Sequence, residues 1–255
     1  MWKLVYGSVR GTSHARSGQP CQDYCTGRAV DSIMIAACSD GAGSASLSHL
    51  GSRLAVECFV EAATQSQDGS PPDRATIESW VELSRRQVLD EASAQGVIPR
   101  QLACTFLGAI VGEDWAVFAQ IGDGVIVFDG ESDYEMAFWP DNGEYANATR
   151  FLTDDDYLDH LRIETVARRI SDLAILTDGM QTLALDFAAA RVHRPFFTPL
   201  FQTVRNGPNV ATLQTSLLGF MDSKRINDRT DDDKTLFLAT RMVPDVPSSL
   251  SDATA

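Results

Sequence analysis

The sequence is poor in basic residues. It holds 21 Lys and Arg against 35 Asp and Glu, a formal net charge of −14. Nucleic acids and anionic membranes bind proteins through a basic face that neutralises phosphates, so we expect neither as a partner. Long apolar runs are also missing: no stretch approaches the roughly 18 apolar residues of a membrane-spanning helix, and the first residues lack the features of a signal peptide. We therefore expect a cytoplasmic protein.

Cysteine is scarce as well. The five cysteines form an odd set, and no two of them have the CxxC spacing of a zinc site or a redox motif. We expect reduced thiols, most of them buried.

What the sequence does contain is a succession of short apolar runs between polar turns. Runs typical of strands cover residues 2–9, 32–38, 102–111, 115–120, 125–129, 134–139, 172–177 and 235–240. Helical spacing predicts helices over residues 47–63, around 77–88, over 180–190 and over 210–221. Strands outnumber helices and do not alternate regularly with them, which favours an α+β fold with antiparallel sheets. We predict one domain over residues 1–243 and a disordered Pro- and Ser-rich tail over 244–255.

Four acidic motifs lie at the ends of predicted strands. Three are Asp-Gly pairs that follow an apolar strand, beginning at Asp40, Asp123 and Asp178, and the fourth is the run 231–233 before the last strand. A single Asp-Gly pair is more often a hairpin corner, as we expect for Asp129 and Gly130. The repetition favours convergence of these carboxylates in one oxygen-rich pocket. Such a pocket suits Mg²⁺ or Mn²⁺ better than zinc.

In content and order, these motifs resemble those of the metal-dependent protein phosphatases of type 2C. The motifs are Gln22-Asp23, Ser39-Asp40-Gly41-Ala42-Gly43, Thr105-Phe106-Leu107-Gly108, Ile121-Gly122-Asp123, Thr177-Asp178-Gly179 and Asp232-Asp233-Lys234-Thr235. A divergent bacterial branch is the most similar, because of Ser13-His14, Pro20 to Asp23, Gly143 to Asn147 and Arg229 to Thr235. The resemblance implies a central antiparallel β-sandwich flanked by helices in four layers, α-β-β-α.

The resemblance also implies a metal centre at one end of the sandwich. Asp40 would bridge two Mn²⁺ or Mg²⁺ ions, with Asp178 and Asp232 completing the first site. The Gly41 carbonyl would join the second site, with Asp23 beside it. Whether Asp232 or Asp233 is the ligand stays open, with Asp232 preferred.

The implied reaction is hydrolysis of phosphoserine and phosphothreonine by a metal-activated water, without a phosphoenzyme. The catalytic residues would be Asp40, Asp178 and Asp232, and Asp123 with Asp178 would hold a third, weaker metal ion. The substrate would be a phosphoprotein made by a bacterial-type Ser/Thr kinase, and we expect a monomer.

Because the sequence departs from the family pattern, the residue that binds the substrate phosphate is not assigned by the resemblance. Gly18 stands where main-branch members carry an arginine, so Arg16 is a candidate phosphate ligand. His14 is a candidate proton donor to the leaving group. Glu144 and Asn147 are candidate substrate contacts.

Two alternatives remain open from the sequence. One is a catalytically weak or inactive regulatory module that keeps the fold and binds a partner, suggested by Gly18 and by Gln22 in place of the usual glutamate. The other is a broader phosphomonoesterase that includes phosphotyrosine among its substrates.

Overall fold

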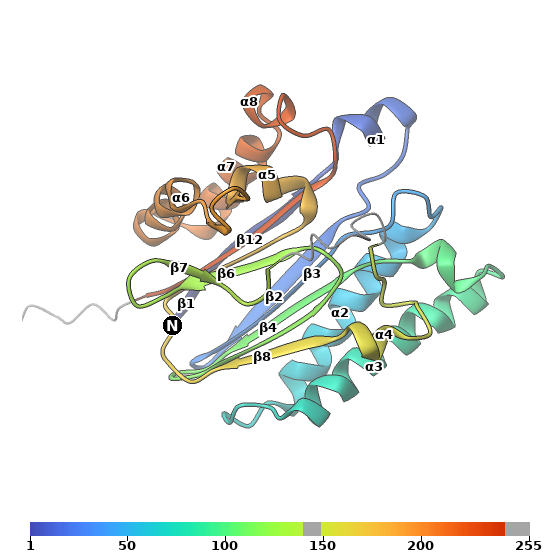
Figure 1. Cartoon of the computed structure of the whole chain (residues 1–255), viewed down its shortest axis with the longest axis horizontal. Coiled ribbons are helices and arrows are strands. Elements are labelled where there is room, and N and C mark those ends of the chain that lie inside the picture. The colour runs from blue at the N-terminus through green and yellow to red at the C-terminus, as the bar shows by residue number, and fades with distance from the viewer. Residues whose placement is uncertain (140–148, 243–255) are drawn as a thin grey trace, which may run out of the picture.

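The computed structural model describes residues 1–139 and 149–242, and two five-stranded antiparallel sheets form its centre (Figure 1). The first sheet has the order β1 (Trp2–Val9), β12 (Lys234–Arg241), β9 (Asp172–Leu176), β6 (Val125–Asp129) and β7 (Tyr134–Met136). The second has the order β2 (Tyr24–Val30), β3 (Ile33–Ser39), β4 (Phe106–Val111), β5 (Ala116–Ile121) and β8 (Arg162–Val166).

Helices cover the outer face of each sheet. The long helices α2 (Ser48–Ser66) and α3 (Arg74–Ala94) pack on the second sheet, and α6 (Arg194–Asn206) and α7 (Val210–Met221) pack on the first (Figure 1). The shorter elements are α1 (Thr12–Ser17), η1 (Pro99–Leu102), α4 (Tyr157–His160), η2 (Asp178–Met180), α5 (Gln181–Ala184), β10 (Leu185–Asp186), β11 (Arg191–Val192) and α8 (Lys224–Asn227).

Strand β3 shows how the sequence produces these layers. Successive side chains of a strand point to opposite faces of its sheet. Ile33, Ile35 and Ala37 therefore join the core beneath α2 and α3, whereas Met34 and Cys38 join the core between the two sheets. A strand buried on both faces must be largely apolar, as β3 is from Ile33 to Cys38. The α+β prediction with antiparallel sheets between helical layers is confirmed.

The helix predicted over residues 180–190 is confirmed only over Gln181–Ala184, and the prediction is wrong for residues 185–190. Helix α5 ends at Ala184, and the chain continues as the hairpin of β10 and β11. The Asp186 carboxylate accepts a hydrogen bond from the Ala189 backbone N–H and pairs with Arg191, and Ala190 has a φ of 47°. These local interactions stabilise a turn where the alanines alone favour a helix.

Other boundaries also differ from the predictions. The strand predicted from residue 102 begins at Phe106, because residues 99–102 form the 3₁₀ helix η1. The strand predicted to residue 139 ends at Met136. Strands β2 and β8 and helix α6 were not predicted; α6 carries Pro195 in its first turn and Pro199 in its interior. The predicted tail lies outside the described residues.

The five cysteines are free thiols, three of them buried. Among residues 1–139 and 149–242, no helix combines the length and apolarity needed to cross a membrane.

Candidate metal centre

The sheet registers bring the acidic motifs together at one end of the sandwich. In the second sheet Tyr24 lies opposite Ser39, so the residues just outside this pair, Asp23 and Asp40, lie side by side. In the first sheet Leu236 lies opposite Leu176, which places the residues before β12 beside those after β9. Antiparallel pairing therefore joins segments that are far apart in the sequence.

Asp40 lies at the centre of this group. Its backbone N–H donates to the Thr105 hydroxyl over 2.9 Å, and its carbonyl accepts from the Thr105 N–H over 2.8 Å, so the start of β4 fixes the turn after β3. Burial, followed by the charges of Asp23 and Asp178, raises the pKa of Asp40 well above its usual range. Gly41 follows directly, and its N–H donates to the Gln22 carbonyl.

Asp23 is almost completely enclosed, with 5% of its surface exposed. Its Oδ2 accepts hydrogen bonds from the hydroxyls of Thr177, at 2.7 Å, and Thr235, at 2.9 Å. Burial raises the pKa of Asp23 to about 7, although the Thr177 hydrogen bond acts in the opposite direction. Its other oxygen, Oδ1, is buried and has no hydrogen-bond donor within the described part of the chain.

Asp178 and Asp123 lie next to each other. Burial, followed by the charges of Asp123 and Asp232, raises the pKa of Asp178 to about 6. The Asp123 Oδ2 accepts a hydrogen bond from the Thr149 hydroxyl over 3.0 Å, and its carbonyl accepts from the Gln181 side chain. Gln181 begins α5, so this contact connects the two Asp-Gly turns.

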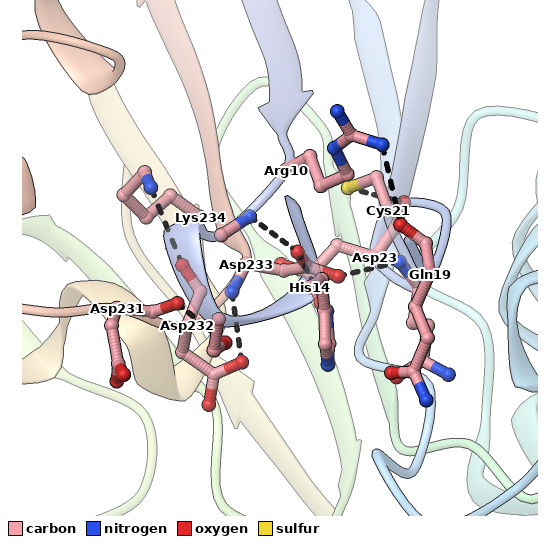
Figure 2. A network of polar contacts seen from close by, with 12 residues as sticks. Arg10, His14, Gln19, Cys21, Asp23, Asp231, Asp232, Asp233 and Lys234 are labelled. Atoms are coloured by element: carbon pink, nitrogen blue, oxygen red, sulfur yellow. Dashed lines mark hydrogen bonds and ion pairs between the residues drawn. The ribbon is translucent and has the colours of Figure 1, made fainter. Parts of the chain in front are cut away.

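The carboxylates of the neighbouring residues Asp232 and Asp233 have different surroundings (Figure 2). Asp233 has a side chain that is 1% exposed, and it accepts hydrogen bonds from the backbone N–H groups of Gly11, at 2.6 Å, and Gln22, at 2.5 Å. Asp232 is exposed, and its Oδ1 accepts only the Asp233 N–H among the described residues, at 2.8 Å. The Asp232 carboxylate therefore keeps most of its lone pairs free, whereas each oxygen of Asp233 already accepts a backbone N–H.

Two glycines allow the 231–233 segment to approach the other motifs. A Cβ on Gly179 would lie 1.9 Å from the Asp233 carbonyl oxygen, and one on Gly11 would lie 2.4 Å from the Asp232 carbonyl carbon. No side chain fits at either place. The absence of both side chains lets this segment pass between Asp178 and the loop that leads into α1.

The two candidates on α1 have different positions. Arg16 is exposed and forms an ion pair with Asp231 at 3.1 Å, so its guanidinium points to the acidic segment from outside. His14 has a side chain that is 13% exposed, and its Nδ1 lies 3.0 Å from the Asp233 Oδ1. The other two candidates, Glu144 and Asn147, lie outside the described residues.

The donor set fits a hard divalent cation. It consists of carboxylates, and the charges of Asp23, Asp178 and Asp232 all act on Asp40. Like charges so close together favour a bound proton, and a bound cation would take the place of that proton. The unpartnered Asp23 Oδ1 is an oxygen that such a cation, or its water, would satisfy.

The carboxylates are near one another but are not yet arranged around a common point. No group of three or more His, Cys, Asp or Glu side chains in the described ranges could hold a metal ion as it stands.

Sequence reasoning missed the role of the two threonines that hold Asp23. Thr177 and Thr235 neighbour each other across β9 and β12, and the Thr235 N–H also donates to the Thr177 hydroxyl over 3.1 Å. The available signal was a threonine beside each of two acidic motifs at strand ends. Without the register, nothing in the sequence indicates that both face Asp23.

The chain has relatives among known proteins. The protein phosphatase 2C family matches residues 10–221. Serine/threonine-protein phosphatase 3 of Escherichia coli (strain K12) is 39% identical over 251 residues, which covers 93% of this chain and 98% of the relative.

Solved structures share the fold at low identity. A serine/threonine phosphatase of S. agalactiae has a TM-score of 0.62 at 13% identity, with 94% of this chain and 100% of that chain covered. The Mycobacterium tuberculosis serine/threonine phosphatase PstP/Ppp has a TM-score of 0.60 at 13% identity, with 95% and 99% covered. With the family match and the E. coli relative, these findings show that the chain belongs to the protein phosphatase 2C family.

Proposed function

We propose that this chain hydrolyses phosphoserine and phosphothreonine in phosphoproteins with the help of two Mn²⁺ or Mg²⁺ ions. The family is one of metal-dependent phosphatases, and the E. coli relative is named as a serine/threonine phosphatase. The observation that carries the proposal is the meeting of Asp40 with Asp23, Asp178 and Asp232 at one end of the sandwich. Carboxylates that crowd together in a partly buried place are costly unless a cation neutralises them.

Different residues of the chain would bind each of the metal ions. Asp40 would contribute to both sites, Asp178 and Asp232 would complete the first, and the Gly41 carbonyl and Asp23 would serve the second. Asp123 with Asp178 would form a third, weaker site. The bound cations would supply a nucleophilic water at neutral pH and offset the charge of the phosphoryl oxygens.

Other side chains would orient these ligands and the substrate. The hydroxyls of Thr177 and Thr235 fix one oxygen of Asp23, so its Oδ1 would be available to the second metal ion or to its water. His14 would give a proton to the leaving alkoxide. Arg16, Glu144 and Asn147 stay predictions as substrate contacts, as do the cytoplasmic location, the monomeric state and a Ser/Thr kinase as the opposing enzyme.

The proposal is tested by phosphate release from a phosphoserine peptide and from p-nitrophenyl phosphate. We expect Mn²⁺-dependent turnover of both, its loss with chelator, and its loss in Asp178→Asn. The control is Asp155→Asn, because Asp155 is a fully exposed surface aspartate. Activity that survives both chelation and Asp178→Asn would exclude a metal mechanism.

The same assay decides between the alternatives from the sequence. Inactivity of the metal-loaded wild type on every phosphosubstrate would favour the regulatory module. A phosphotyrosine peptide turned over as fast as the phosphoserine peptide would indicate the broader phosphomonoesterase.

A further inference from the structure

Helix α1 is attached to the acidic segment before β12 by consecutive contacts. The Ser13 N–H and hydroxyl both donate to the Asp231 carbonyl, at 2.9 and 2.6 Å, and Arg16 pairs with the Asp231 side chain. His14 lies between Ser13 and Arg16 in the sequence, and its ring is beside Asp233 (Figure 2). A helix of six residues has little stability of its own, so these contacts determine where the His14 ring lies.

The opposite edge of the imidazole faces the Asp40–Gly43 turn. A Cβ on Gly43 would lie 4.0 Å from the His14 Nε2 and 4.0 Å from the Gln22 Oε1. Gln22 is 2% exposed, and its Oε1 has no hydrogen-bond partner among the described residues. The His14 Nε2 and an unsatisfied acceptor therefore both lie beside Gly43, in the turn that begins at Asp40.

Asp233 is well placed to hold that ring. Its carboxylate is buried and is itself fixed by the N–H groups of Gly11 and Gln22. The Asp233 Oδ1 forms a 3.0 Å ion-pair contact with the His14 Nδ1, a buried ring nitrogen that has no hydrogen-bond partner among the described residues. A carboxylate that accepts from one ring nitrogen fixes the tautomer and the direction of the other.

We infer that Asp233 is a positioning residue that holds His14 with its Nδ1–H on the carboxylate and its Nε2 toward the reacting phosphate ester. The inference rests on the proposed function, because it concerns the proton donor of that reaction. As the bond between phosphorus and the serine oxygen breaks, the Nε2 proton of the imidazolium passes to that oxygen. The attacking water loses a proton in the same turnover, so the number of protons balances and the imidazole can be protonated again.

The activity test uses two leaving groups. Serine alkoxide needs a proton to leave, whereas p-nitrophenolate does not. We expect His14→Gln to lower kcat about 100-fold on a phosphoserine peptide and less than about threefold on p-nitrophenyl phosphate. We expect Asp233→Asn to lower kcat about 10-fold on the peptide, again with little change on the aryl ester, and to add little in the His14→Gln background.

The chain offers a matched control. His160 and Asp156 form another His–Asp pair, with 3.1 Å between Nε2 and Oδ2, on the exposed surface. His160→Gln should leave the ratio of the two activities unchanged. Equal losses on both substrates in His14→Gln or Asp233→Asn would mean that the pair only supports the fold, and would overturn the inference.

A second measurement does not depend on activity. ¹⁵N NMR of the neutral imidazoles in the metal-free protein, with the His14 signals assigned by their loss in His14→Gln, reports its tautomer. We expect the Nδ1–H form in the wild type and a shift toward Nε2–H, which free imidazoles prefer, in Asp233→Asn. An Nε2–H wild type would overturn the inference. If the wild type hydrolyses neither substrate with Mn²⁺, the proposed function fails, and the tautomer result still decides whether Asp233 positions His14.

Discussion

Two runs of three aspartates in this chain have opposite surroundings. The surface run (Asp154, Asp155 and Asp156) precedes α4, and the strand-end run (Asp231, Asp232 and Asp233) precedes β12. Each run has one aspartate beside a histidine, at 3.1 Å in the surface run and 3.0 Å in the strand-end run. In the surface run Asp156 is exposed and the His160 side chain is 29% exposed, whereas in the strand-end run the His14 and Asp233 side chains are 13% and 1% exposed.

The difference comes from the element that follows each run. Helix α4 is a four-residue helix at the surface, so its acidic residues meet water and nearby Arg side chains. Strand β12 is paired on both sides, with β1 and with β9, so the segment before it is held in place among the other acidic motifs. Identical tripeptides therefore differ in chemistry because of the backbone that carries them.

The largest expected difference between the runs is in activity. Asp232→Asn should lower Mn²⁺-dependent phosphopeptide hydrolysis by about 100-fold or more, because even indirect support of a metal ligand is worth 10- to 100-fold. Asp155→Asn should leave the rate unchanged. The measurement is kcat/KM for both variants at saturating Mn²⁺. A normal rate in Asp232→Asn, together with loss of activity in an Asp233→Asn protein that is normally folded, would move the ligand role to Asp233.

The second largest difference between the two runs should be in their contribution to the unfolding free energy. Asp233→Ala leaves the buried N–H groups of Gly11 and Gln22 without their acceptor, which costs about 2–5 kcal/mol of unfolding free energy. Asp155→Ala removes only an exposed carboxylate, 3.6 Å from Arg85, and should have no measurable effect. Urea unfolding of the metal-free proteins measures both. Equal midpoints for the two variants would contradict the structural role of Asp233.

The stability that Asp23 contributes beside the strand-end run and the stability that Asp156 contributes in the surface run should change with pH in opposite directions. Beside the strand-end run, burial raises the pKa of Asp23 to about 7, so the folded metal-free protein binds more protons than the unfolded chain. Its stability should then fall as pH rises from about 4 to about 7, and Mn²⁺ should reverse the fall. Hydrogen bonding to His160 lowers the pKa of Asp156, so its contribution is present above the ordinary pKa and is lost as pH falls.

Two substitutions isolate these contributions. Asp23→Asn should flatten the fall in stability between about pH 4 and about pH 7, whereas Asp156→Asn should leave the slope in that window as it is. An unchanged slope in Asp23→Asn would show that its carboxyl is not protonated in the folded state.

The smallest effect is expected at the exposed edge of the strand-end run. Arg16→Ala removes an ion pair whose partners are 68% and 66% exposed, so the unfolding free energy should change by less than about 0.5 kcal/mol. We also expect KM for the phosphopeptide to rise no more than about threefold, because this guanidinium already has a carboxylate partner. A tenfold rise in KM at unchanged stability would identify Arg16 as the phosphate ligand.

The sequence predicted the parts of the site that local pattern determines. Apolar runs ending at Asp40, Asp123 and Asp178 identified the strand ends, and the family resemblance predicted their convergence. The sequence alone could not decide whether Asp232 or Asp233 is the metal ligand. The two differ in which carboxylate accepts the backbone N–H groups of Gly11 and Gln22.

The fold was predicted where the pattern is strong and missed where tertiary contacts dominate. The continuous apolar run of β3 requires burial on both faces and was recognised. Strand β2, whose second half is exposed, has no such signature. The hairpin of β10 and β11 depends on the side chain of Asp186, which competes with the helical preference of its neighbours.

The pairing of the first and last strands determines when this site can exist. Trp2 lies opposite Arg241 in the register of β1 and β12, so residues 2–241 must all have been made before this pair can form fully. During synthesis, Asp232 and Thr235 therefore join the site after every other acidic motif. We expect molecules that stop before residue 232 to be inactive toward phosphoproteins, whatever else has already folded.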